Sequence, residues 1–439
     1  MTSPPVPSGT VAVQGREIVY VGPRESAPPG NDVDLGDSIL LPGLVNAHTH
    51  LELTAFRGLL EEMPFEQWVF RLQAAKIGVM TEADYVDSVR LGILEGLYSG
   101  VTTFGDTCDS GVSLSVMGEF RVRGVMYQEV FGPSPEQCAG SLAVLKRKIT
   151  ALRQQSAHSN DDSSLLTLGV SPHAPYTVSD QLFAAVARFA IEESLPLAVH
   201  IAESEAELQY VRCGDGPFAE ALRARGIHVA SRARSPIALL NDTGVLGCRP
   251  LLIHAVRADA EDVEIMSKTQ CAVAHCPVSN AKLGHGTAPI TEFLAAGIPV
   301  GLGSDSMASN NCMNLLDEAR IAFLMQRTRS NAAAGLSAAD LIELVTLGGA
   351  RALGLSDTIG SLEPGKEADL VAFSLEGASG SPFYAPETAL VFALACKMAK
   401  FVTVAGELRV WESRALVDEI GIANRVAKTA RKLYNFVNR

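Results

Sequence analysis

The sequence of 439 residues contains eight cysteines but no Cys-x-x-Cys pair. The cysteines are scattered, at positions 108, 138, 213, 248, 271, 276, 312 and 396. Small secreted domains instead rely on dense, regularly spaced cysteines that form disulfides. The pattern here therefore predicts a reduced protein located in the cytoplasm.

The chain also lacks segments that would direct it to a membrane. Its first residues, Met-Thr-Ser-Pro-Pro-Val-Pro, have neither the basic nor the apolar part of a signal peptide. The longest apolar stretch, residues 389–405, is interrupted by Lys397 and Lys400. It predicts a buried strand or helix, because a membrane span needs about 20 predominantly apolar residues.

Positive charge is scarce as well. The chain has 36 Lys and Arg against 49 Asp and Glu, which gives a formal net charge of −13. Nucleic-acid binding depends on Lys and Arg, so neither a nucleic acid nor a membrane is an expected partner. A small-molecule substrate is expected instead, and self-association into a homo-oligomer is left open.

Strand-like and helical segments alternate through the middle of the chain. The strand-like runs are Leu41–Ala47, Val101–Gly105, Gly124–Val130, Leu165–Val170, Leu195–Val199, Pro250–Ile253, Cys271–Ala274 and Ile298–Gly303. Helical patterns separate them, among them Ala83–Tyr98, Gln137–Arg153, Asp180–Glu193, Asp259–Lys268, Asn314–Gln326 and Ala338–Leu353. This order predicts an α/β fold, a (β/α)8 TIM barrel. An open doubly wound sheet is the alternative, but no Gly-x-Gly-x-x-Gly motif follows the first strand.

Further β-type runs lie near both ends of the chain, at residues 10–22, 368–374 and 401–410. They predict a small β-sandwich domain assembled from residues 1–42 and 360–416, next to a barrel of residues 43–359. Two unrelated terminal caps are the alternative. Residues 417–439 are predicted to form a C-terminal helix.

Two histidines, His48 and His50, follow the first apolar run of the barrel. On an extended strand, side chains two residues apart point to the same face. Neutral imidazole is the commonest protein ligand for zinc-like metals. The pair therefore predicts either a metal site or two hydrogen-bonded histidines at a strand edge.

Other polar residues end later strands of the predicted barrel: His200 the fifth, His254 the sixth and Asp305 the eighth. Active sites of such barrels lie where the strands end, so these side chains are expected to meet the first two histidines. His48, His50, His200 and Asp305 are predicted to bind a divalent metal ion. Zinc is the default for a hydrolytic site with nitrogen and oxygen ligands, and iron or manganese are the alternatives.

A single ion is predicted rather than two. Barrels that hold two metal ions commonly need a carboxylated lysine at the end of the fourth strand. Here that strand runs Leu-Gly-Val-Ser171-Pro172-His173-Ala174-Pro175, and this segment contains no lysine.

Glu203 lies three residues beyond His200, where it can reach the substrate side of the ion. A carboxyl group there can protonate a ring nitrogen while water attacks the adjacent carbon, and zinc lowers the pKa of its water to about 7. His254 can hydrogen-bond the attacking water, and Asp305 is expected to take part in catalysis besides binding the metal. The purely structural alternative for Glu203 is a carboxylate favoured in the first turn of a helix.

With these residues in place, the chain resembles the amidohydrolase superfamily, in particular its purine and triazine deaminase and chlorohydrolase branch. The matching segments are residues 42–50 (Pro-Gly-Leu-Val-Asn-Ala-His-Thr-His), 199–203 (Val-His-Ile-Ala-Glu), 275–283 (His-Cys-Pro-Val-Ser-Asn-Ala-Lys-Leu), 303–306 (Gly-Ser-Asp-Ser) and 360–370. The resemblance covers nearly the whole chain. It implies a metal-dependent hydrolase that replaces an aromatic ring amine by oxygen and releases ammonia.

Two substrate classes follow from this resemblance. The segment His173-Ala174-Pro175-Tyr176 is similar to S-adenosylhomocysteine/methylthioadenosine deaminases. That family also has a ribose-binding glutamate, which would align near Lys76-Ile77, and an arginine after the third strand. The third strand here ends Tyr127-Gln128-Glu129-Val130, so both features are missing and this substrate is disfavoured.

The second class is favoured. The His-Thr-His-Leu-Glu segment ending at Glu52, the Glu129-Val130 ending and the Glu203-Ser-Glu-Ala-Glu run are similar to aminodeoxyfutalosine deaminases. The resemblance implies an adenine nucleoside with a benzoate-like group on its 5′ side as the substrate. The residues implied to line its pocket are Glu52, Glu129, His173 and Asn280. The alternative is that these side chains only make hydrogen bonds that stabilise the fold.

The same residues leave two alternatives to this function. A triazine chlorohydrolase or an amidase-type hydrolase is an enzymatic alternative, and a non-catalytic assembly protein is disfavoured because the ligand and proton-transfer candidates are all present. His50-Leu51-Glu52 matches the His-x-Glu of cytidine deaminases, but the Pro-Cys-x-x-Cys of that class is absent. The histidines left without a role are His158, His228, His275 and His285.

Overall fold

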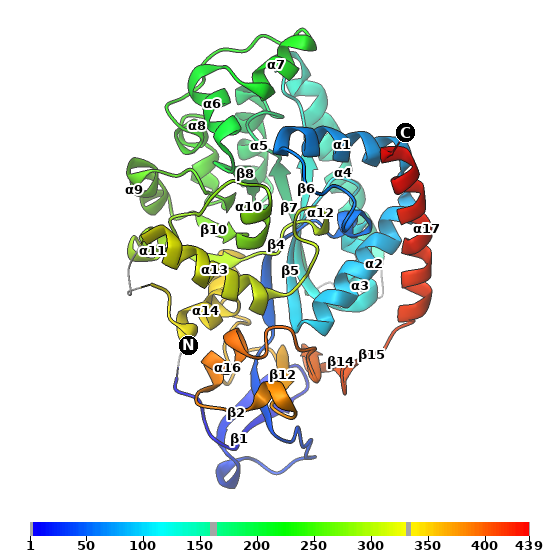
Figure 1. Ribbon diagram of the computed structural model, residues 1–439, viewed down its shortest axis with the longest axis vertical. Coiled ribbons are helices and arrows are strands. Elements are labelled where there is room, and N and C mark those ends of the chain that lie inside the picture. Colours follow the sequence, from blue (N-terminus) through cyan, green and yellow to red (C-terminus); the bar gives the residue numbers. More distant parts are fainter. Residues whose placement is uncertain (1–2, 159–164, 331–334, 439) are drawn as a thin grey trace.

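The computed structural model describes residues 3–158, 165–330 and 335–438. At its centre is a barrel of parallel strands with helices around it (Figure 1). Its strands are β4 (Leu44–Thr49), β5 (Val101–Cys108), β6 (Arg123–Val130), β7 (Leu166–Pro172), β8 (Ala198–Ile201), β9 (Leu251–His254), β10 (Ala272–His275) and β11 (Val300–Leu302). These match the predicted strands in number and order.

The barrel is closed at two seams between its halves, β4-β5-β6-β7 and β8-β9-β10-β11. At one seam, Val170 of β7 pairs in parallel with Leu197, just before β8. At the other, Thr49 of β4 pairs with Asp305, just beyond β11. The predicted α/β barrel is thus confirmed, and the open doubly wound sheet is excluded.

The first predicted strand, Leu41–Ala47, was wrong as a single element. The chain forms β3 (Ser38–Pro42), which belongs to another sheet, and then enters the barrel as β4. The crossing point is Gly43, whose backbone N–H donates to the carbonyl of Asp369. A Cβ atom at this residue would lie 2.2 Å from Oγ1 of Thr102, so only glycine fits between the two sheets.

Helices cover the outside of the barrel (Figure 1). They are α1 (Phe65–Val79), α2 (Glu82–Tyr98), α3 (Ser113–Phe120), α4 (Cys138–His158), α5 (Asp180–Glu192), α6 (Glu205–Cys213), α7 (Pro217–Ala224), α8 (Pro236–Asp242), α9 (Ala260–Thr269), α10 (Pro277–Lys282), α11 (Ile290–Ala295), α12 (Met307–Asn310), α13 (Leu315–Ser330), α14 (Ala338–Leu344) and α15 (Leu347–Ala352). A 3-10 helix, η2 (Leu51–Phe56), follows β4 directly.

The predicted helix Ala338–Leu353 is wrong in one respect, because it is broken between α14 and α15. The break turns the carbonyl of Val345 toward the barrel, where it accepts a hydrogen bond from the N–H of Val45 (2.8 Å). Gly349 then lies so close to β4 that a Cβ atom would be 2.8 Å from the carbonyl oxygen of Val45. Tertiary contact with the strand thus overrides the helical pattern of the sequence.

Strands from both ends of the chain form the small β region at the end of the barrel away from α6 and α7 (Figure 1). A five-stranded sheet has the order β15 (Arg414–Ala415), β14 (Glu407–Trp411), β13 (Phe401–Val404), β12 (Leu370–Ser374), β3. The hairpin β1 (Gly9–Gln14) and β2 (Glu17–Pro23) packs on it through Ile18, which contacts Ala368 and Leu370. This fits the predicted sandwich, while the domain bounds 1–42 with 360–416, 43–359 and 417–439 stay a prediction.

The last helix, α17 (Glu419–Val437), lies along α1 and α2 on the outside of the barrel (Figure 1). Lys432 and Thr429 both contact the carboxylate of Asp84 on α2. The apolar stretch 389–405 forms α16 (Pro386–Phe392) and β13. Within the described part of the chain, no helix has the length and apolar character needed to cross a membrane.

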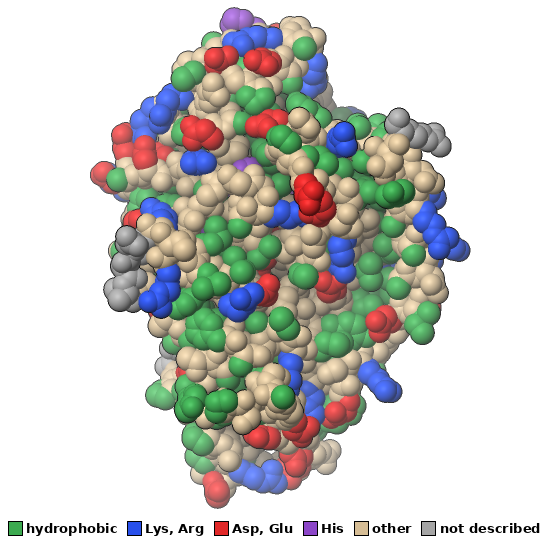
Figure 2. All heavy atoms as spheres, viewed as in Figure 1, with side chains coloured by type: hydrophobic (Ala, Val, Ile, Leu, Met, Phe, Trp, Pro, Cys, Tyr) green, Lys and Arg blue, Asp and Glu red, His purple; other side chains and the backbone are tan. Residues whose placement is uncertain are grey.

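Acidic and basic side chains are interspersed over the face seen in Figure 2, with no large region of one sign. All eight cysteines belong to the described residues, and each of them is free. The free cysteines agree with their scattered positions in the sequence.

A buried ion pair joins the barrel to the small sheet. Arg123, the first residue of β6, donates from Nε to Oδ2 of Asp369 (2.9 Å) and from an Nη to Oδ1 (3.0 Å). Asp369 also accepts from the backbone N–H of Ala405, the residue that follows β13 of the small sheet (2.7 Å). Both charged side chains are almost fully buried.

We expect Asp369→Ala to lower the free energy of unfolding by about 3–5 kcal/mol, because it leaves the Arg123 guanidinium buried without its main partner. The measurement is the urea midpoint followed by circular dichroism. Lys268→Ala is the control, since its pair with Glu264 is solvent-exposed, and its midpoint should match that of the wild type. An unchanged midpoint for Asp369→Ala would show that this pair does not stabilise the junction.

Candidate active site

His48 and His50 are brought together at the end of β4. His48 is in the strand, and His50 is the residue from which η2 begins. Asp106 of β5 fixes this turn, because its Oδ1 accepts from the N–H of Leu51 (2.7 Å) and from Oγ1 of Thr49 (2.8 Å). The two imidazole rings lie 4.8 Å apart between their centroids.

His200 and Asp305 complete the group. Nε2 of His200 lies 3.1 Å from Nε2 of His50. Oδ1 of Asp305 lies 3.2 Å from Nε2 of His48 and 3.6 Å from Nε2 of His50. The structure thus brings the four predicted ligands close together. His48, His50 and Asp305 offer ligand atoms near enough to share one metal ion, and His200 adjoins them through His50 and forms a similar group with His48 and His254.

Hydrogen-bonding contacts on the outer side of His50, His200 and Asp305 help to fix their orientation. Nδ1 of His50 contacts Oγ1 of Thr107 on β5 (3.1 Å), and Nδ1 of His200 faces the carbonyl oxygen of His173 (3.2 Å). The hydroxyls of Ser279 and Ser309 donate to Oδ2 of Asp305 (2.5 and 2.8 Å). Such outer contacts select the tautomer of a ligating histidine and leave the other ring nitrogen free to bind.

The electrostatics of the group fit a cation. Burial lowers the pKa of His50 to about 3 and also lowers the pKa of His48 and that of His200, so all three rings are neutral. Because a carbonyl oxygen only accepts, His200 carries its proton on Nδ1 and its Nε2 lone pair faces His50. Nitrogen lone pairs this close, next to a carboxylate oxygen, form a donor set that suits zinc.

Glu203, His254 and Asn280 form a second cluster beside these ligands. Nε2 of His254, the last residue of β9, lies 3.5 Å from Oε1 of Glu203. Nδ1 of His254 faces Oδ1 of Asn280 at 3.0 Å. The ring of His254 is 5.8 Å from that of His200, so this cluster adjoins the four ligands. Burial alone would raise the pKa of Glu203, but His254 and His285 outweigh it and the pKa is lowered.

The backbone around Glu203 is held by a residue that the sequence reasoning missed. Oε1 and Oε2 of Glu207, on α6, accept from the N–H groups of Ala202 and Glu203, each at 2.8 Å. Ala202 has a left-handed backbone conformation, with φ of 50°, which is costly for a residue other than glycine. The Glu207 carboxylate therefore fixes the sharp turn between β8 and α6. The sequence signal for this role was the Glu-Ser-Glu-Ala-Glu run at residues 203–207, which ends at Glu207.

The remaining predicted substrate residues lie in two groups. Glu52, in η2, is fully buried and pairs with Nζ of Lys76 on α1 (2.9 Å). Burial would raise the pKa of Glu52, but Lys76 and Ser110 lower it to about 2. Glu129, on β6, points Oε1 toward Nε2 of His173 at 4.0 Å, and His173 is 4.9 Å from His200 between ring centroids.

Glu129 differs sharply from Glu52 in its surroundings. Its Oε1 is buried and has no hydrogen-bond partner among the described residues. Burial raises the pKa of Glu129 to about 8. A carboxyl group that is neutral and unpartnered can donate a hydrogen bond to a ligand or accept one from it.

The histidines without a predicted role have different positions. His275 ends β10 and is fully buried, and burial lowers its pKa to about 3. His285 reaches Oε1 of Glu203, and His228 is exposed. His158 is the last residue of α4, and its side chain lies outside the described residues.

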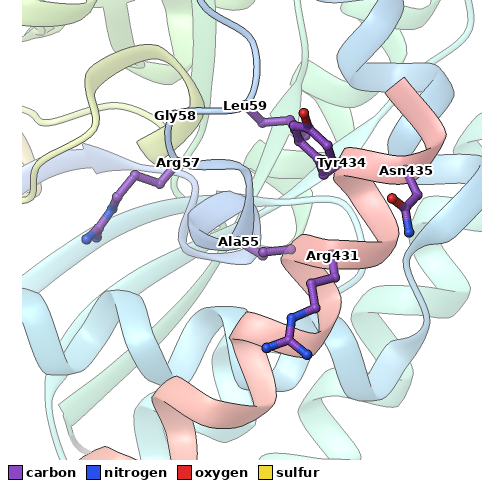
Figure 3. Close-up of a pocket in the computed structure, with 8 residues that line it drawn as sticks. Ala55, Arg57, Gly58, Leu59, Arg431, Tyr434 and Asn435 are labelled. Carbon is purple, nitrogen blue, oxygen red and sulfur yellow. The ribbon is translucent and has the colours of Figure 1, made fainter. Parts of the chain in front are cut away.

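A pocket of about 470 Å³ lies elsewhere, between the segment after β4 and α17 (Figure 3). Its lining residues are Ala55, Arg57, Gly58, Leu59, Ala430, Arg431, Tyr434 and Asn435. None of them is a predicted site residue. The candidate site is instead defined by buried side chains at the strand ends.

Comparisons with known proteins agree with this geometry. The model of the "Amidohydrolase family" matches residues 39–409. The chain is 32% identical to a 5-methylthioadenosine/S-adenosylhomocysteine deaminase of Desulforudis audaxviator, over 98% of this chain and 96% of the relative.

Two solved structures are also similar. An adenosine deaminase from Xanthomonas campestris with bound zinc has a TM-score of 0.85 and 27% identity, covering 98% of this chain and 94% of the other. The atrazine chlorohydrolase of Arthrobacter aurescens, complexed with zinc, has a TM-score of 0.81 and 25% identity, covering 97% and 95%. The resemblance stated from the motifs is confirmed: this chain belongs to the amidohydrolase family.

Proposed function

We propose that this chain is a zinc-dependent deaminase that replaces the exocyclic amine of an adenine nucleoside by oxygen, with 5′-methylthioadenosine or S-adenosylhomocysteine as the substrate. The family and the similar deaminases already make the chain a hydrolase that acts on C–N bonds. The observation that carries the proposal is the position of Glu203 and His254 beside four converging ligand side chains.

We assign the metal to His48, His50, His200 and Asp305. The neutral rings and the outer contacts of His50, His200 and Asp305 support this assignment. One ion is proposed, because β7 is followed by His173 and no lysine is available there. Zinc is the preferred ion, since both similar solved structures contain it. Iron and manganese are the alternatives for this donor set.

The residues around the ion have separate tasks in the reaction. The bound zinc supplies activated water at neutral pH. Glu203, whose pKa is lowered, is ionised; it takes one proton from the attacking water and passes it to the adjacent ring nitrogen. The C–O bond forms first and gives a tetrahedral carbon; the second proton of the water then passes from the new hydroxyl to the amine, the C–N bond breaks, and ammonia leaves as the carbonyl forms. His254 is placed to hydrogen-bond the water and the tetrahedral carbon's oxygen.

The choice of substrate rests on the relatives. The sequence favoured aminodeoxyfutalosine, but the similar curated protein of Desulforudis audaxviator is named for methylthioadenosine and S-adenosylhomocysteine. The comparisons therefore support the substrate that the motifs placed second. Aminodeoxyfutalosine stays the second candidate because of Lys76, which occupies the place of the expected ribose-binding glutamate and is paired with Glu52.

Buried carboxyl groups from other elements could take over the contact with the ribose. Glu129 is the better placed, because its Oε1 is unpartnered and close to His173. Glu52 is already occupied by Lys76, Ser110 and Cys108. We therefore assign substrate binding first to Glu129 and His173, and assign to Glu52 the task of holding Lys76.

A panel of nucleosides tests the substrate. We expect loss of the adenine absorbance with one ammonia released per turnover, and a higher kcat/KM for methylthioadenosine or S-adenosylhomocysteine than for adenosine. Faster turnover of aminodeoxyfutalosine would favour the second candidate. Turnover of none of the four, with an ammonia-free product from a chlorinated triazine, would contradict the deaminase proposal.

Glu203→Gln tests the proton transfer. Glutamine keeps the size of the side chain but cannot carry the proton, so we expect kcat to fall by about 10²- to 10⁴-fold. Zinc content, measured by atomic emission, should stay equal to that of the wild type. The expected loss is far larger than a factor of about two. A kcat of the variant within that factor of the wild type would therefore remove Glu203 from the mechanism.

Ser279→Ala tests the metal assignment without removing a ligand. The variant loses one of the two hydroxyls that fix Oδ2 of Asp305. We expect zinc affinity to fall by about 10- to 100-fold, as for other residues that orient a metal ligand. Competition with a chelator gives the affinity. Ser115→Ala, at an exposed serine of α3, is the matched control and should bind zinc as the wild type does.

A further inference from the structure

His285 occupies a short loop between α10 and α11 that carries it into the interior. Gly284 and Gly286 on either side have φ values of +73° and +100°, a conformation that favours glycine. The N–H of His285 donates to the carbonyl of Asn280 (2.8 Å). The side chain is only 3% exposed, so the two glycines and Asn280 together hold a buried imidazole at a defined position.

That imidazole reaches the proposed proton carrier. Nε2 of His285 lies 3.2 Å from Oε1 of Glu203, and its ring meets the ring of Phe65 edge-on at 4.4 Å. Nε2 of His254 approaches the same Oε1 at 3.5 Å. Nε2 of His285 has no hydrogen-bond partner elsewhere among the described residues, and both imidazoles make their shortest contact with Oε1 of the carboxylate. The two imidazoles thus distinguish the two oxygens of one carboxylate.

The two histidines cannot have the same role. Oδ1 of Asn280 accepts from Nδ1 of His254. In the tautomer whose one proton is on Nδ1, His254 presents a lone pair on Nε2 and cannot donate a hydrogen bond to Glu203. The side chain of His285 has no such contact with Asn280, which accepts only from its backbone N–H. His285 is therefore the donor available to Oε1 of Glu203.

We propose that His285 is a positioning residue for Glu203: its Nε2–H holds Oε1, so that Oε2 alone faces the substrate and carries the proton. Oε1 accepts this hydrogen bond both when Glu203 is ionised and when it is protonated on Oε2. The carboxyl group therefore keeps one orientation while the proton arrives and leaves. The proposal deepens the proposed deaminase function and rests on it for the identity of the proton carrier.

Two substitutions at this residue separate positioning from a merely structural role. His285→Leu keeps the apolar contact with Phe65 but removes the donor, whereas the amide of His285→Gln can donate from nearly the same place as Nε2. We expect kcat of the Leu variant to fall by about 10- to 100-fold, the size found when a supporting hydrogen bond is lost. KM and zinc content should stay close to wild type, and the Gln variant should recover most of kcat.

His228→Leu makes the same exchange at an exposed histidine and should leave kcat and the melting temperature unchanged. A Leu variant as active as the wild type, or a Gln variant as impaired as the Leu variant, would overturn the proposal. An equal rise of KM in both variants would also overturn it, because it would indicate a substrate contact instead.

Crystal structures of the two holoenzyme variants provide a readout that does not depend on turnover. The Glu203 carboxyl group should leave its orientation in the Leu variant and keep it in the Gln variant. If no nucleoside is deaminated but the carboxyl group moves in this way, the proposed function fails and the positioning stands. A carboxyl group that stays in place in both variants would refute the positioning whatever the activity.

Discussion

Three buried, neutral imidazoles packed together beside one carboxylate are the constraint on which this structure depends. Polar groups are costly to bury unless they are paired, and these rings lie in the middle of a closed barrel. Two of the rings and the neighbouring carboxylate are held from behind: His50 by Thr107, His200 by the carbonyl of His173, and Asp305 by Ser279 and Ser309. The strand ends supply ligands and supports together, because parallel strands of a barrel all finish at the same rim.

The second feature of the site is the contrast between its carboxyl groups. Glu203 and Glu52 have lowered pKa values because each is close to a donor or a cation, whereas burial raises the pKa of Glu129. Groups of one kind therefore differ within one site: one is ionised beside two histidines and is the proposed proton carrier, one holds Lys76 and one offers a neutral carboxyl group. Surroundings, rather than residue type, decide these roles.

Much of this was predictable from the sequence, for definite physical reasons. Strands that alternate with helices predict a barrel, and polar residues directly after apolar strands predict the ligands His48, His50, His200 and Asp305. The break at Val345 was not predictable, because it depends on a hydrogen bond to Val45, three hundred residues earlier in the chain. The same holds for the pairing of Lys76 with Glu52 and for the approach of His285 to Glu203, which join separate elements.

The seam between β4 and β11 joins the architecture to the chemistry. The N–H of Asp305 donates to the carbonyl of His48 (3.0 Å), so the contact that shuts the barrel links two of the four converging side chains. At Gly303 the strands approach so closely that a Cβ atom would lie 2.9 Å from the backbone of His48. A chain that opened here would lose the Asp305 carboxylate from this group and its circular sheet in one event, which makes integrity of the cylinder a condition for assembling the group at all.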